Sequence, residues 1–277
     1  MARRNNKDRA SAPAVPPVPP VPQFSGALSF TRPTEFVQLP TEGKFYPEGH
    51  PLHLVPEVEI NYMTAKEEDI LTSRALISRG IVIDRLIQSV LIDKTIDVTT
   101  LYPGDKTALM IAARATGYGP EYTGQVTCPA CSHKHEHVVD LTNLPIKKVP
   151  EDINLTAAGT FAIKLPVTGF TAELRILSSR EQKFLDDSGK TNLKHNLPEA
   201  NRTSLLKMIV VSINSIRDRQ ELENFIDQMP AQDSRTIKKM YDSVNPSLDM
   251  DQEVQCPNCQ HVVVREVPLG INFLWPS

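Results

Sequence analysis

A basic excess is missing from this sequence, which has 30 Lys and Arg against 33 Asp and Glu and a formal charge of −3. Nucleic-acid affinity is carried mainly by clustered Lys and Arg, so no nucleic-acid partner is expected. No apolar run approaches the roughly 20 residues that a membrane-spanning helix needs, and the first residues lack the apolar core of a secretory signal. We therefore expect a soluble protein made in a cytoplasm, without direct membrane insertion.

The common catalytic motifs are also missing: we find no Walker A sequence, G-x-G-x-x-G, G-x-S-x-G elbow or H-E-x-x-H helix. Some carboxylates fall at expected helix starts and turns, where the helix dipole and capping already explain acidic residues: Glu67, Glu68, Asp69, Asp93, Asp97 and Asp105. Their spacing does not match a calcium loop. The sequence therefore offers no catalytic residue, and we expect no enzymatic activity.

Cysteine is scarce, and the four that are present form two close pairs, Cys128 with Cys131 and Cys256 with Cys259. Each pair reads C-P-x-C, with strand-like residues before it and β-branched residues after it. Two such turns facing one another complete a tetrahedral four-thiolate zinc site with no vacant position, which is the structural type. The sequence predicts one structural Zn²⁺ held by these four cysteines. The second pair lies far along the chain from the first, so an insertion must leave and return.

Three other interpretations of the pairs stay open. A redox couple needs a C-x-x-C at a helix N-terminus, whereas both pairs have strand and turn context. Two disulfides would suit an extracellular protein. A catalytic zinc needs an open position, and a nearby histidine (His133, His135, His137 or His261) is a possible replacement for one cysteine. The alternation of the first three histidines more simply places them on one solvated face of a strand.

The pattern along the chain predicts an α+β protein: a helical body, small β elements and a split four-cysteine zinc ribbon. Residues 1–33 read as a disordered Pro-rich tail with P-x-x-P spacings. Residues 34–119 read as a β element followed by a three-helix unit over 64–117. The zinc-ribbon and β region covers residues 120–178 and 246–277, and a helical insertion covers residues 179–245.

Local signals place individual helices. A capping box at Thr64 and Glu67 predicts one helix from about Ala65 to Gly80. The segment 178–189 is expected to end at its glycine, and 200–216, apolar on nearly all sides, to be a central buried helix. Phe273 and Trp275 either fold back on the core or anchor in a neighbouring subunit.

Several stretches resemble the baseplate hub subunits of T-even-type contractile-tailed phages. They are FVQLPTEGKFYPEG at 36–49, NYMTAKEEDILTS at 61–73, GDKTALMIAARATGYGPEYTGQVTCPAC at 104–131, and CPNC followed by NFLWP near the end. The Pro-rich stretch at 10–22 departs from the pattern. The resemblance implies a non-enzymatic virion protein of the tail baseplate, assembled in the host cytoplasm and bound to other hub and tail proteins.

The expected function is thus that of a structural hub protein in tail assembly, with zinc knitting residues 120–140 to 253–268. Self-association within the symmetric tail is left open, as are the copy number and the identity of the partners. One alternative is a hub assembly factor that is absent from the mature virion. A second is a zinc-ribbon nucleic-acid-binding regulator, and a third is a zinc hydrolase with bound water.

Overall fold

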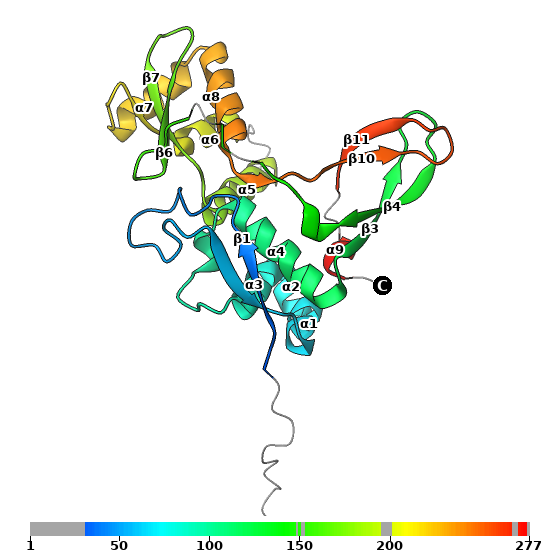
Figure 1. Cartoon of the computed structure of the whole chain (residues 1–277). Coiled ribbons are helices and arrows are strands. Elements are labelled where there is room, and N and C mark those ends of the chain that lie inside the picture. Colours follow the sequence, from blue (N-terminus) through cyan, green and yellow to red (C-terminus); the bar gives the residue numbers. More distant parts are fainter. Residues whose placement is uncertain (1–30, 148, 151–152, 195–200, 268–270, 276–277) are drawn as a thin grey trace, which may run out of the picture. The chain divides into compact units, whose positions relative to one another are not determined.

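The computed structural model describes residues 31–147, 149–150, 153–194, 201–267 and 271–275, and the chain from Pro33 onward forms one unit (Figure 1). Its α+β class is confirmed, since helices alternate with short antiparallel strands. The predicted tail at 1–33 lies almost wholly outside the described residues. Within the described part of the chain, no helix is both long enough and apolar enough to cross a bilayer.

The first half of the unit begins with an antiparallel strand pair and continues into helices. The pair forms because Val58 and Ile60 alternate with polar residues and bury one face. The elements are β1 (Thr34–Gln38), β2 (Glu57–Asn61), α1 (Ala65–Thr72), α2 (Arg74–Ser78), α3 (Val82–Val90), the 3-10 helix η1 (Val98–Thr100) and α4 (Pro103–Tyr118).

A hydrophobic cluster, here called the first core, joins this half of the chain. It contains Ile60 of β2, Leu71 of α1, Leu86 of α3 and Leu109 of α4, all at most 1% exposed. It also takes in residues from the far end of the sequence, among them Phe273. The N-terminal helices and the C-terminal segment therefore share one apolar interior.

The second half contains a three-stranded sheet of order β6-β7-β8 with helices around it. Its hydrophobic cluster, here called the second core, includes Phe161, Leu174, Ile209 and Ile237. The elements are β6 (Thr160–Lys164), β7 (Thr171–Arg175), α5 (Ser179–Lys194), α6 (Asn201–Ile209), β8 (Val210–Ile213), α7 (Arg219–Gln228) and α8 (Ala231–Val244).

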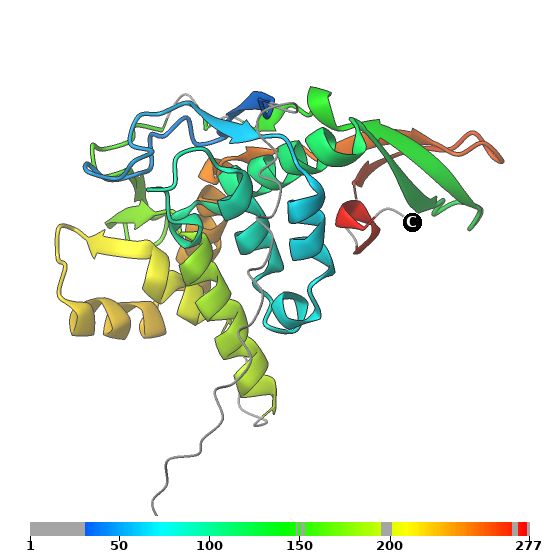
Figure 2. The same cartoon turned by 90° about the horizontal axis from the view of Figure 1, so that it is seen from below.

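Two β-hairpins and a small ladder complete the unit. Each hairpin is a separate two-stranded antiparallel sheet, and the two lie side by side in Figures 1 and 2. The elements are β3 (Glu121–Thr127) with β4 (Lys134–Asp140), β10 (Asp251–Gln255) with β11 (Val262–Glu266), the ladder β5 (Ile146–Lys147) with β9 (Ser247–Leu248), the 3-10 helix η2 (Leu141–Asn143) and α9 (Ile271–Leu274).

Three predicted helix boundaries are wrong. The expected helix from Ala65 to Gly80 breaks at Ser73, whose extended backbone separates α1 from α2. Helix α5 does not stop at Gly189 but continues to Lys194. The predicted central helix over 200–216 changes at Val210 into β8, because its β-branched residues pair with β7.

Gly104 fixes how closely the start of α4 approaches the chain that enters β9. A Cβ at this position would lie 2.0 Å from the carbonyl oxygen of Pro246 and 3.0 Å from the Cα of Ser247. We expect Gly104→Ala to cost about 2 kcal/mol through overpacking, which lowers the Tm by roughly 5 °C for a unit of this size.

Gly117→Ala is the matched control within the same helix. Its new Cβ would meet mainly the flexible end of the Met63 side chain, which can move aside, so its thermal unfolding should shift less. If Gly104→Ala unfolded at the wild-type temperature, the close approach of α4 to Pro246 would be contradicted.

Candidate metal centre

The turn between β3 and β4 carries the first cysteine pair. The amide of Cys128 donates to the carbonyl oxygen of His133 at 2.9 Å, and the amide of Ser132 donates to the carbonyl oxygen of Cys128 at 2.9 Å. Ser132 has a φ of 59°, a left-handed conformation that closes the turn. The tight loop turns both sulfur atoms toward the same side.

The turn between β10 and β11 repeats this geometry. The amide of Cys256 donates to the carbonyl oxygen of His261 at 2.9 Å, and the amide of Gln260 donates to the carbonyl oxygen of Cys256 at 2.9 Å. Gln260 has a φ of 57°, matching its counterpart in the first turn. The same C-P-x-C sequence therefore folds into the same turn twice, at places far apart in the chain.

The two turns bring all four predicted cysteines together. Their Sγ atoms lie within 4.8 Å of one another. Two pairs join the turns, Cys128 to Cys259 and Cys131 to Cys256, each at 3.7 Å between sulfur atoms. A disulfide needs about 2.05 Å between sulfur atoms, and all four cysteines are free in this structure, so the disulfide interpretation does not fit this arrangement. Four sulfurs at about 2.3 Å from a central Zn²⁺ would be separated by about 3.8 Å in a tetrahedron.

The electrostatics of the cluster also suit a cation. Hydrogen bonds from the backbone of His133 and the side chain of Asn258 lower the pKa of Cys131 to about 6. The backbone of His261 favours the Cys259 thiolate in the same way, but the three neighbouring cysteine sulfurs and desolvation together outweigh it and raise the pKa of Cys259 to about 12. Four thiolates cannot coexist at this spacing without a positive ion, and a divalent metal supplies it.

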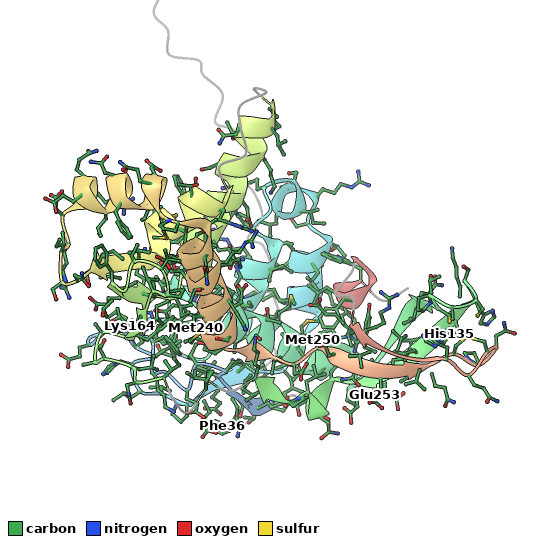
Figure 3. The ribbon with its side chains drawn as sticks, turned by 90° about the horizontal axis from the view of Figure 1, so that it is seen from above. Phe36, His135, Lys164, Met240, Met250 and Glu253 are labelled. Atoms are coloured by element: carbon green, nitrogen blue, oxygen red, sulfur yellow. The ribbon has the colours of Figure 1, made fainter. Side chains whose placement is uncertain are left out.

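The nearby histidines take no part in the cluster. Among the described residues, the group of potential metal ligands contains the four cysteines and no histidine or carboxylate. His135 and His137 are half-buried on the same side of β4 as the buried Val139, so placing them on a solvated face was wrong. Figure 3 shows His135 on the β4 hairpin. Both ring nitrogens of His135 lack a hydrogen-bond partner within the described structure.

The C-terminal aromatic residues fold back onto this chain. Phe273 is 1% exposed and packs edge-on against Tyr122 of β3, with ring centroids 5.1 Å apart. The indole Nε1 of Trp275 donates to the carbonyl oxygen of Leu71 at 2.8 Å. Arg114 of α4 donates through Nε to the carbonyl oxygen of Phe273 at 3.3 Å. The first of the two interpretations offered for these aromatics is therefore correct.

A buried polar group was missed by sequence reasoning. Asp105 is fully buried and accepts three hydrogen bonds, from the amide of Thr41 at 3.0 Å, the hydroxyl of Thr41 at 2.7 Å and the hydroxyl of Tyr46 at 2.8 Å. Burial raises the pKa of Asp105, and the bonds from Thr41 and Tyr46 oppose that rise. It is a structural partner of a distant loop and does more than cap a helix.

Glu67 combines two structural roles. It completes the predicted capping box, accepting from the amide of Thr64 at 2.9 Å, and also accepts from the hydroxyl of Ser89 on α3 at 2.6 Å. The carboxylate therefore ties α1 to α3, as expected for a structural residue.

Comparison with known proteins agrees with this picture of a structural protein. The family model described as T4 bacteriophage base plate protein matches residues 32–270. No curated protein and no solved structure shows a significant match. The matched range spans most of the chain and includes both cysteine turns. The chain therefore belongs to the T4 bacteriophage base plate protein family.

Proposed function

We propose that the chain is a structural subunit of the baseplate hub of a contractile phage tail, and that one Zn²⁺ bound by Cys128, Cys131, Cys256 and Cys259 stabilises it. The observation that carries the role in the tail is the family match over residues 32–270. The four-sulfur cluster supports the zinc part of the proposal. Zinc is favoured because it takes four thiolates tetrahedrally without redox chemistry.

The zinc acts as a clasp between two distant parts of the chain. It ties the hairpin of residues 120–140 to that of residues 253–268, which are separated in the sequence by the sheet β6-β7-β8 and its helices. Each hairpin is a two-stranded sheet, which is marginally stable by itself. The clasp therefore presents a rigid surface to neighbouring tail proteins. We propose no catalytic role for the metal, because four protein sulfurs leave it no open coordination position.

Mass spectrometry of purified virions tests the structural role. We expect peptides from this chain at a constant ratio to those of known tail proteins. Their absence would favour an assembly factor that leaves before maturation. A gel-shift at low salt supplies a second check, since tight, steeply salt-dependent DNA binding would instead favour a nucleic-acid regulator.

A further inference from the structure

Strand β1 has an open edge. Two hydrogen bonds at the ends of the β1–β2 pair show which residues of β1 bond to β2. The amide of Leu39 donates to the carbonyl oxygen of Pro56 at 2.8 Å, and the amide of Tyr62 donates to the carbonyl oxygen of Pro33 at 2.9 Å. Antiparallel residues alternate between bonding to the partner strand and facing away from it. The backbone groups that face away from β2 therefore belong to Thr34, Phe36 and Gln38.

The two outer edges of this strand pair differ. On β2, the carbonyl oxygen of Glu59 accepts from the amide of Ile92 at 3.3 Å, and Ile60 forms a bridge with Leu91. On β1, the outward amide and carbonyl groups of Phe36 and Gln38 have no hydrogen-bond partner in the described part of the chain. The edge of β2 is thus covered, while the edge of β1 keeps its donors and acceptors available.

A cavity of about 230 Å³ runs along this open edge, here called the β1 slot. Residues 35–38 line one side of it. The floor is formed by small side chains of α4, and the opposite wall by apolar residues that follow β4; these lining residues include Ala108, Ala112, Ala115, Leu141, Leu144 and Ile146. Figure 2 shows β1 beside the segment that contains η2. The slot combines unpaired backbone groups with a mixed lining, in which Glu35, Gln38 and Thr142 stand beside the apolar side chains.

The shape of the slot favours a single strand. Residues 141–146 close its far side, so a second copy of the whole β1–β2 pair could not lie edge to edge there. Phe36, which is labelled in Figure 3, is 61% exposed, and β1 contains neither lysine nor proline to discourage pairing. Such an edge is a template for strand addition.

We propose that the β1 slot binds an extended segment of another tail protein, which adds to β1 as a third strand. Apolar side chains at alternate positions of this segment fill the slot. Glu35 is the only charged residue among those that line the slot, and it is acidic, so the segment carries a Lys or Arg that faces it. The inference rests on the role in the tail proposed above and does not depend on the metal.

Hydrogen exchange tests the added strand directly. We compare the free chain with the same chain in purified tails and follow the backbone amides of Phe36 and Gln38 by mass spectrometry with fragmentation to single residues. An added strand is expected to slow both amides about tenfold or more in tails, because it accepts their hydrogen bonds. Equal exchange in the two samples would overturn the proposal. A chain absent from tails would instead refute the proposed function.

A substitution in the slot provides an independent test of the added strand. Ala112→Leu fills the floor of the slot, and we expect it to be incorporated about tenfold less than wild type when the two compete during tail assembly. Phe184→Ala, which removes an exposed aromatic on α5 outside the slot, is the matched control and should compete equally. Thermal unfolding checks that Ala112→Leu is folded. Equal incorporation of a folded Ala112→Leu would contradict the proposal.

The same hydrogen-exchange measurement separates two other occupants of the slot, the chain's own N-terminal segment and a second copy of the chain. If the free chain already protects Phe36 and Gln38, and deletion of residues 1–30 removes this protection, the occupant is its own N-terminal segment. If protection in the free chain rises with protein concentration, the occupant is a second copy. Either result would overturn the assignment to another tail protein.

Discussion

Removal of the metal by a chelator is expected to make residues 251–267 sensitive to protease while α1, α3 and α4 stay folded. Structural zinc contributes on the order of 10 kcal/mol, which is comparable to the net stability of a whole domain. Without it, the two hairpins lose the link between their turns, and each has only two strands. Limited proteolysis with mass mapping measures this, and Cys256→Ser should reproduce it.

The helices provide the internal control for metal removal. The first core is built around helix residues such as Leu86 and Leu109, although it also includes Tyr122 of β3 and Val139 of β4. Trp275, the only tryptophan, is held by its bond to Leu71 and by neighbours in that core, so its fluorescence should change little. Unchanged protection of 251–267 after complete metal removal would contradict the clasp.

His133→Ala is the matched control for Cys256→Ser. The His133 side chain is exposed and belongs to the first cysteine turn without being one of the clustered ligands. We expect this variant to keep its metal and its protease resistance. Loss of the metal would show that a histidine nitrogen takes part in binding, and would favour the mixed-ligand alternative.

Asp105→Ala should have the second large effect, a loss of about 3 to 5 kcal/mol in the free energy of unfolding. The substitution leaves the buried amide and hydroxyl of Thr41 and the hydroxyl of Tyr46 without an acceptor, and each such group costs about 1 to 3 kcal/mol. For a unit of this size the Tm should fall by roughly 10 °C. Thermal and urea unfolding measure both quantities.

Asp187→Ala is the comparison for Asp105→Ala. Asp187 forms an ion pair with Lys190 on the surface of α5, and both side chains are largely exposed. Exposed pairs contribute about 0 to 1 kcal/mol, so this variant should unfold close to wild type. If the two aspartate variants were equally stable, the buried network around Asp105 would not contribute as the geometry indicates.

Local signals in the sequence predicted much of the fold where a single physical rule decides. The capping box at Thr64 and Glu67 predicted a helix start, and α1 begins at Ala65 as expected. The close approach of the four cysteines follows from their repeated spacing.

The failures have a common physical cause, which is tertiary contact. A continuous apolar run such as Met208 to Val211 has no periodicity that separates a buried helix from a buried strand. From Val210 onward the chain forms a strand because it pairs with β7. The hydroxyl of Ser212 also donates to the carboxylate of Glu173 at 2.9 Å, which stabilises this pairing. Likewise, the local sequence around Asp105 predicts only a helix-start residue. Its structural role could not be predicted, because its partners Thr41 and Tyr46 are remote in the sequence.

X-ray absorption at the zinc edge, with metal analysis of the purified chain, tests the metal clasp most directly. We predict one zinc per chain and a first shell of four sulfurs at about 2.3 Å, with no bound water. A shell with fewer than four sulfurs, or a metal-free chain that stays folded with its cysteines as free thiols or disulfides, would contradict it.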